Sequence, residues 1–248
     1  MKIHVGCCGW SYFQPGEFLG GNWKDGFGSV LEAYASKFDC VEINSTFYGI
    51  PKIPTAEKWF REARAVNKKF VFTVKCSGLV THRSPFGKQA VPAFNLLRQV
   101  CEALHTDIML LQSPASFGPT KQNIEKMEKF FAKIRREGLK LAWEPRGKWW
   151  NEPVLVKDVC EKYDLVNCVD PLRNEPRHFG TRQKTAYFRL HGFGWPSIYG
   201  YDFSDRELQK IAGKVSGLVK ARVIKDAWIM FNNAECYGNA LKFESLFS

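Results

Sequence analysis

Acidic, basic and amide side chains follow the short apolar runs of this 248-residue sequence at regular intervals. Glu42, Glu144 and His191 are of the types that most often move protons in enzymes, since a His titrates near neutrality and a carboxyl group does so where its surroundings raise its pKa. The other residues in these positions could bind and orient a substrate: Asn44, Tyr48, Lys75, Gln112, Arg146, Asp170, Arg189, Asn232 and Asn233. The pattern predicts a polar site with three catalytic residues and nine substrate-binding residues.

The same residue types leave other roles open. Glu42 and Glu144 could be the two carboxyl groups of a glycoside hydrolase, a reaction that requires a separation the sequence does not give. They could also be structural, with Glu42 paired to Arg189 and Glu144 paired to Lys75 or Arg146 in a buried charge network. A binding role predicts that alanine at Glu42 or Arg189 abolishes binding and leaves stability nearly intact, whereas a structural role predicts the reverse.

A metal or another cofactor has little support in the sequence. The chain has five His residues, no HExxH motif and no Cys/His spacing of the zinc-finger type. Lys75, Arg146 and Arg189 would lie beside any acidic ligand set and oppose a metal ion. Cys7 and Cys8 include one thiol that should face the site, but no base for a nucleophilic thiol can be named from spacing. We therefore expect no metal and no cofactor.

Eight short apolar runs have the length and composition of strands buried on both faces. They are Ile3–Cys7, Cys40–Ile43, Phe70–Lys75, Ile108–Gln112, Leu139–Glu144, Leu165–Asp170, Ala186–His191 and Trp228–Asn232. Segments with apolar residues at helical spacing lie between them, at Phe27–Lys37, Thr55–Ala65, Pro92–His105, Gln122–Glu137, Pro153–Tyr163, Ser204–Val219 and Asn239–Phe247. Pro171–Lys184 lacks such a pattern and is predicted to be a long loop.

Strands that alternate with helices imply a parallel sheet, and eight such units in a chain of this length predict one α/β domain over residues 1–248, a (β/α)8 TIM barrel. An open doubly wound sheet is the alternative, but the sequence has no GxGxxG turn. Barrels of this kind bind ligands at the C-terminal ends of their strands. Because side chains alternate along a strand, Glu42 and Asn44 should share one face, as should Arg189 and His191. The polar residues should therefore surround one pocket.

The formal net charge of +11 favours anionic partners, such as phosphates, carboxylates or nucleic acid. Basic residues gather in two predicted loops of the pocket face, at Arg83, Lys88, Arg173, Arg177, His178, Arg182 and Lys184. Aromatic residues lie among or near them, at Trp10, Tyr12, Phe47, Tyr48, Phe86, Trp149, Trp150, Trp195, Tyr199 and Tyr201. Basic and aromatic side chains together are typical of sites for sugar phosphates or unstacked nucleotides.

No apolar run approaches the roughly 20 residues that a membrane span needs, so we expect no membrane association. The N-terminal residues enter a strand pattern directly and lack the apolar core and cleavage site of a secretory signal. Eight Cys residues without a disulfide-type pattern are typical of a reducing compartment. A cytoplasmic location is expected.

Several sequence blocks resemble the YecE-like family, also called domain of unknown function 72. Residues 41–48 read VEINSTFY, residues 144–146 with Trp149 and Trp150 resemble the ExRxxSW block, and residues 187–192 read YFRLHG. The chain departs from the family pattern at Ser113 and Pro145, which leaves every charged candidate in place. The resemblance implies a TIM barrel with a shared site, and a relation to endonuclease IV-like barrels and nucleic-acid binding has been suggested for the family.

Three hypotheses follow. The first is an enzyme that acts on a small anionic substrate bearing a phosphate or carboxylate. The second is a protein that binds or processes nucleic acid through basic and aromatic loops. The third is a scaffold without catalysis. The sequence does not predict the oligomeric state.

Overall fold

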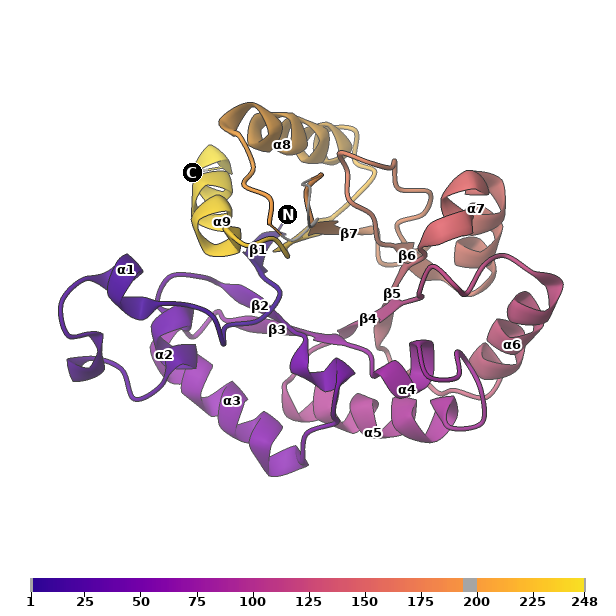
Figure 1. The fold of residues 1–248 in the computed structure, drawn as a ribbon, viewed down its shortest axis with the longest axis horizontal. Helices are drawn as coiled ribbons and strands as arrows, with labels where there is room; N and C mark the ends of the chain where they lie inside the picture. Colours follow the sequence, from indigo (N-terminus) through magenta and orange to yellow (C-terminus); the bar gives the residue numbers. More distant parts are fainter. Residues whose placement is uncertain (1, 194–199, 248) are drawn as a thin grey trace.

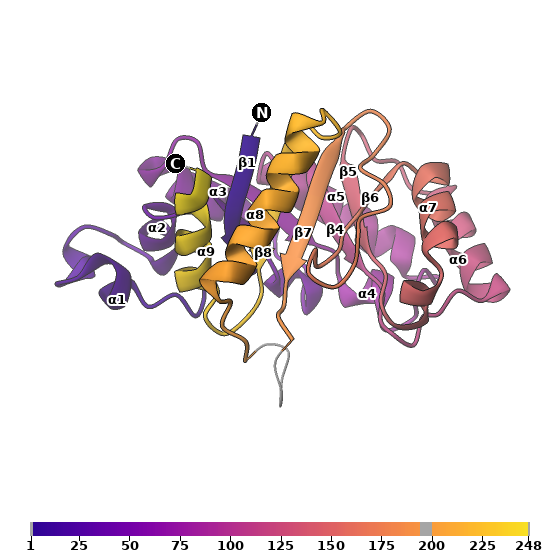
Figure 2. The same ribbon diagram turned by 90° about the horizontal axis from the view of Figure 1, so that it is seen from above.

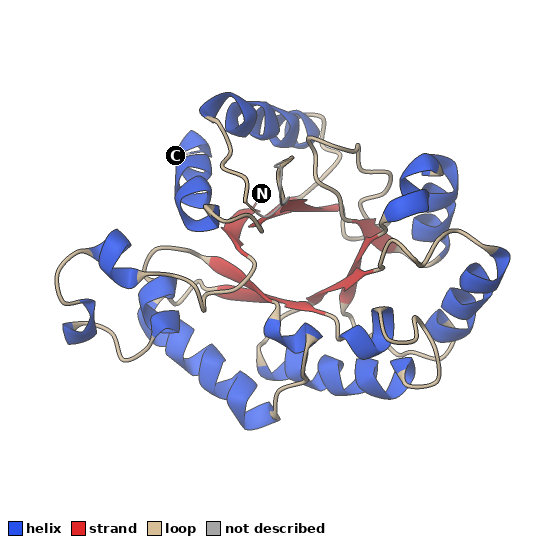
Figure 3. Cartoon of the chain, viewed as in Figure 1, coloured by secondary structure: helices blue, strands red, loops and turns tan. Residues whose placement is uncertain are grey.

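Eight parallel strands form one sheet that curves into a ring, and helices surround it (Figure 1, Figure 3). The structure is a computed structural model, and it describes residues 2–193 and 200–247. The neighbouring strands follow the order β6-β5-β4-β3-β2-β1-β8-β7. Their bounds are β1 Lys2–Cys7, β2 Cys40–Ile43, β3 Val71–Lys75, β4 Ile108–Gln112, β5 Lys140–Glu144, β6 Leu165–Asn167, β7 Thr185–Leu190 and β8 Asp226–Phe231. The predicted (β/α)8 barrel is confirmed.

Helices lie outside the ring, as α8 does beside β7 (Figure 2). The α-helices are α1 Pro15–Leu19, α2 Val30–Ala35, α3 Ile53–Val66, α4 Gly78–Thr81, α5 Ala90–Ala103, α6 Lys121–Phe131, α7 Pro153–Lys162, α8 Asp205–Lys220 and α9 Cys236–Glu244. Short 3-10 helices occur at η1 Trp23–Asp25, η2 Ser45–Phe47, η3 Gly147–Asn151 and η4 Ser245–Phe247. None of the helices in the described residues is long and apolar enough to cross a membrane.

Side-chain caps set the starts of several helices. Ser29 accepts a hydrogen bond from the backbone N–H of Glu32 at the start of α2, and Thr120 does the same for Asn123 at the start of α6. Helix α6 ends at Phe131, six residues before the predicted end at Glu137. Beyond this end, Arg136 donates hydrogen bonds to the carbonyls of Tyr163 and Asp164.

The ring closes between β6 and β7 through Val169, which lies two residues beyond the end of β6. Val169 forms an isolated parallel bridge with Phe188, and its carbonyl accepts a hydrogen bond from the N–H of Arg189. Strand β6 itself stops at Asn167, whereas the sequence predicted a strand to Asp170. The N–H of Asn167 donates to the carbonyl of His178 in the loop that follows, while the N–H of Cys168 still bonds to the carbonyl of Trp143 on β5.

The segment at residues 171–184 contains no helix and connects β6 to β7 directly, as predicted. It begins at the C-terminal face and then runs back to the N-terminal end of the barrel. There the N–H of Thr181 and the amide of Gln183 bond to Asp164, just before β6. The carbonyl of Lys184 accepts from the N–H of Lys225, just before β8. The expectation that all basic residues of this loop face the pocket is therefore wrong for its second half, which holds Arg182 and Lys184.

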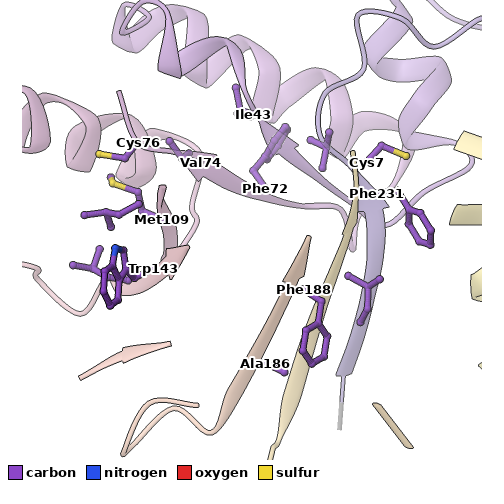
Figure 4. Packing of buried hydrophobic residues seen from close by; sticks show 14 of the residues in the cluster. Cys7, Ile43, Phe72, Val74, Cys76, Met109, Trp143, Ala186, Phe188 and Phe231 are labelled. Atoms are coloured by element: carbon purple, nitrogen blue, oxygen red, sulfur yellow. The ribbon is translucent and has the colours of Figure 1, made fainter. Parts of the chain in front are cut away.

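Two apolar layers pack on the two sides of the strands. The outer layer fills the space between strands and helices and includes Phe72, Met109 and Phe188 (Figure 4). The inner layer fills the barrel with buried side chains from alternate strand positions: Cys40, Ile108, Leu110, Ala142, Val166, Cys168, Tyr187, Trp228 and Met230. This inner layer forms the floor beneath the C-terminal ends of the strands.

One glycine is required for the approach of β1 to β2. A Cβ atom on Gly6 would lie 2.2 Å from the carbonyl oxygen of Cys40, its partner in the sheet. We expect Gly6→Ala to lower the free energy of unfolding by roughly 1–3 kcal/mol, because backbone must shift to relieve the clash. Urea unfolding monitored by circular dichroism measures the change. Gly213→Ala is the control, since its Cβ would meet nothing within 4 Å in α8 and should stabilise slightly. Equal stability of the two variants would contradict this packing.

Candidate functional site

Polar residues occupy the inward-facing positions at the C-terminal ends of the strands, directly above the inner apolar layer. Glu42 follows Cys40 by two residues on β2, and Arg189 follows Tyr187 by two on β7, so both point into the barrel with the layer below them. The same alternation places Lys75 on β3 and Glu144 on β5, and Arg146 and His191 lie just beyond the ends of β5 and β7. We call this group the rim cluster: Glu42, Lys75, Glu144, Arg146, Arg189 and His191.

The guanidinium of Arg189 lies at the centre of the rim cluster and is fully buried. Its Nε and Nη2 atoms donate to the two oxygens of Glu42 at 3.1 and 2.9 Å, and its Nη1 donates to Oε2 of Glu144 at 2.7 Å. The hydroxyl of Tyr187 donates a further hydrogen bond of 2.8 Å to Glu42. Arg189 therefore joins β2, β5 and β7 across the interior of the barrel.

Glu144 also binds Arg146. Its Oε1 accepts from Nε of Arg146 at 2.8 Å and from the amide of Gln112 at 3.3 Å. Burial alone would raise the pKa of Glu144, but the charges of Arg189 and Arg146 outweigh burial and hold this pKa well below its usual range. Glu144 is thus an anion at neutral pH, and both of its oxygens are engaged.

His191 is held as a neutral imidazole. Burial lowers its pKa to about 3, and the charges of Arg189 and Arg146 also lower it while Glu144 opposes them. Nη2 of Arg146 lies 3.0 Å from Nε2 of His191, and Nδ1 of His191 lies 3.1 Å from the carbonyl oxygen of Arg189. Since a guanidinium only donates, Nε2 accepts and Nδ1 carries the proton.

Lys75 has different surroundings. Its Nζ lies 4.6 Å from the centre of the Phe47 ring, and among residues 2–193 and 200–247 no carboxylate lies within 4.0 Å of it. Burial, reinforced by the charge of Arg189, lowers the pKa of Lys75 to about 8. The pKa of nearby His82 is lowered to about 4, by burial first and then by Lys75 and Arg146. Burial is the larger cause of both pKa shifts, and neighbouring cations add to it.

Asp170 anchors the start of the long loop. Its Oδ1 accepts from the N–H of Leu172 at 3.0 Å, and its Oδ2 accepts from the N–H of His191 at 3.2 Å. Burial raises its pKa in spite of these bonds. The carboxylate thus fixes His191 and the loop relative to each other.

Six predicted site residues lie outside the rim cluster. Gln112 and Asp170 bond to members of it, and the other four do not take part in its charge network. Asn44 donates to the carbonyl of Cys8 at 2.9 Å, while its buried Oδ1 has no hydrogen-bond partner in the part of the chain that the structure describes. Tyr48 is 81% exposed and packs edge to face on Phe47. Asn232 lines a separate pocket beside β1, β8 and α9. Asn233 occupies the outward position and uses its amide to bind the carbonyl of Tyr201 and Oδ1 of Asn239, which joins β8 to α9.

Neither cysteine at the end of β1 has the surroundings of a nucleophile. Cys7 is buried on the outer side of the strand. Cys8 faces the rim cluster, with its Sγ 3.6 Å from Nη2 of Arg189, and burial followed by the charge of Glu42 raises the pKa of its thiol well above the usual value. Within the described part of the chain, no three His, Cys, Asp or Glu side chains come together in a way that could hold a metal ion.

A pocket adjoins the rim cluster between α7, β6 and the first half of the long loop. Glu144, Arg146 and His191 form its inner wall, and Trp150, Val156 and Arg173 lie around it. We call it the side pocket. Trp149, Trp150 and Arg173 were predicted to lie at the pocket face. His82 and Asn167 were not predicted as site residues, because a His in a loop or an Asn in a strand indicates a site only when its spatial neighbours are known. Trp195 and Tyr199 lie outside the described residues.

Arg189 provides a test of this arrangement. Arg189→Met would leave Glu42 and Glu144 buried without their shared cation, and we expect the free energy of unfolding to fall by about 3–5 kcal/mol. The double variant Glu42→Gln/Arg189→Met should lose less than the sum of the single changes. Urea unfolding measures both, with exposed Arg206→Met as the control. A loss below about 1 kcal/mol for Arg189→Met would show that the network does not support the barrel.

Comparison with known proteins places these residues in a family. The family model described as "Protein of unknown function DUF72" matches residues 4–247. The UPF0759 protein YunF of Bacillus subtilis is 23% identical to this chain over 266 residues, covering 93% of this chain and 88% of YunF. The crystal structure of a DUF72 family protein from Thermotoga maritima is 24% identical, covers 100% of this chain and 99% of its own, and has a TM-score of 0.72.

A more distant structure has the same fold. An AP endonuclease of family 2 from Brucella melitensis covers 94% of this chain and 92% of its own, with 9% identity and a TM-score of 0.55. At this identity the likeness concerns the barrel alone.

Proposed function

The chain belongs to the DUF72 family, and we propose that its rim cluster binds the phosphate or carboxylate group of a small substrate on which the protein acts as an enzyme. The observation that carries the proposal is Lys75, a half-buried cation without a carboxylate partner among the described residues. The rim cluster holds three cations, Lys75, Arg146 and Arg189, but only two carboxylates. A bound anion would balance this charge.

The proposal divides the roles differently from the sequence-based expectation. Glu42 and Glu144 are engaged by Arg189 and Arg146, so we assign them to positioning rather than to proton transfer. Neutral His191 would orient the substrate through hydrogen bonds. Lys75 is the group whose pKa, about 8, suits proton exchange near neutral pH. It would bind the anion when protonated and could exchange a proton with the bound substrate.

Sulfate binding tests the role of Lys75, because sulfate keeps the same charge across the pH range used. The pKa of about 8 is a lowered lysine pKa, so the cation is present below pH 8 and is lost above it. Sulfate should bind at pH 6.5 and weaken by roughly tenfold or more at pH 9.5. Isothermal titration calorimetry measures the affinity at each pH.

Three variants complete this experiment. Lys75→Met should bind weakly at both pH values, and Lys75→Arg should keep its affinity at pH 9.5 because a guanidinium stays protonated. Lys69→Met, an exposed change just before the same strand, should behave as the unchanged protein. Wild-type affinity in Lys75→Met would contradict the proposal.

Nucleic-acid binding is the alternative, and the net charge of +11 together with Arg173 and Arg177 beside half-exposed Trp150 supports it. Arg182 and Lys184 at the opposite end of the barrel weaken the case for one continuous basic surface. A strand-binding surface should retain a single-stranded oligonucleotide at 50 mM salt and lose affinity steeply as salt rises. Fluorescence anisotropy measures this, and no binding at low salt would remove the alternative.

A further inference from the structure

The side pocket lies partly outside the barrel, where a regular barrel would have a helix after β6. Asn167 occupies an outward-facing position on β6 and lines the pocket together with Val156 of α7. The segment at residues 171–177 covers the strand there, and the Nζ of Lys214 on α8 holds it through the carbonyl of Pro171 at 2.7 Å. The missing helix thus leaves a recess that opens onto the rim cluster.

An unsatisfied donor lies in the wall of this recess. Asn167 is 2% exposed, and its Oδ1 accepts from the N–H of Arg177 at 2.9 Å, which fixes the orientation of the amide. Its Nδ2 has no hydrogen-bond partner among the described residues. The Nε of Arg173, also in the pocket wall, makes no hydrogen bond within the described residues, although it lies 4.0 Å from Oδ2 of Asp170 in an ion pair. A buried donor without a partner destabilises the fold, and an acceptor on a ligand would offset that cost.

Two Trp side chains form part of the remaining walls, which also include the polar residues Asp170, Asn174, Glu175 and Arg177. Trp149 is buried edge to face against Trp143, and its Nε1 is bonded to the carbonyl of Phe117. Trp150 is 49% exposed, and its Nε1 donates to the carbonyl of Pro145 at 2.9 Å, so the indole is held in place. These rings offer faces rather than polar atoms to the pocket. Rigid aromatic walls with donors behind them suit a planar group.

We propose that the side pocket binds a planar ring with hydrogen-bond acceptors, covalently joined to the anionic group that the rim cluster holds. Arg146 and His191 belong to both the pocket wall and the rim cluster, so one molecule can contact the two regions. Asn167 Nδ2 donates to a carbonyl or ring nitrogen of the ligand, and Trp150 covers the face of the ring. This substrate class rests on the proposed function, since the anion must sit on the rim cluster.

Two phosphates that differ in the ring provide the test. Uridine 5′-monophosphate carries a planar ring with carbonyl acceptors, and ribose 5-phosphate has the same anionic group without the ring. We expect the first to bind at least tenfold more tightly than the second, as measured by isothermal titration calorimetry at pH 6.5. Equal affinities in a protein that binds sulfate normally would overturn the side-pocket proposal and leave the proposed function standing.

Variants assign the preference to named residues. Asn167→Asp keeps the acceptor for the N–H of Arg177 and removes the free donor, and Trp150→Ala removes the covering ring. Each should reduce the preference for uridine 5′-monophosphate at least fivefold, while Trp150→Ala leaves sulfate affinity within twofold. Tyr12→Ala, at an aromatic that is 86% exposed and lies outside the side pocket, is the control.

The remaining outcomes separate the two proposals. A preference for the ring that survives both Asn167→Asp and Trp150→Ala would overturn the assignment to the side pocket. Ring-dependent binding that is insensitive to Lys75→Met would support the pocket and contradict the role of the rim cluster. Absence of binding by sulfate and by both phosphates would overturn the two proposals together.

Discussion

The buried guanidinium of Arg189 is the interaction on which the rest of the site depends. A charge at this depth is tolerable only because Glu42 and Glu144 approach it from two other strands and Tyr187 completes the hydrogen bonding of Glu42. Arg189 thereby fixes where both carboxylates point. Its backbone also closes the ring, through the carbonyl of Val169, so one residue links barrel closure to site geometry.

That arrangement leaves Glu144 little freedom to act as an acid or a base. Glu144 is kept ionised by Arg189 and Arg146, and His191 is kept neutral by burial and the same cations. Lys75 differs because it faces an aromatic ring and has no carboxylate beside it in the described residues. The two carboxylates of the rim cluster balance the charges of Arg146 and Arg189. Lys75 adds one further positive charge at the edge of the cluster.

The loop after β6 has a second consequence for the site. A helix in this position would pack over the outer face of β6. The loop instead covers the strand, whose three residues are all buried, and crosses back to the N-terminal end of the barrel. This irregularity places the side pocket next to the rim cluster, and it also separates Arg173 and Arg177 from the other basic residues of the same segment.

The sequence by itself determined the barrel, because buried strands appear as apolar runs. It also indicated where the rim cluster lies, because alternation along the strands places Glu42, Glu144 and Arg189 on the inward face. It left open which charges pair, since spacing carries no information on contacts between strands far apart in the chain. Only the tertiary structure decided that Arg189 takes both carboxylates, that Lys75 takes neither, and that Asn233 joins β8 to α9 instead of facing the rim. The physical reason is that burial and distance, rather than residue type, determine which polar group is satisfied by the fold and which remains for a ligand.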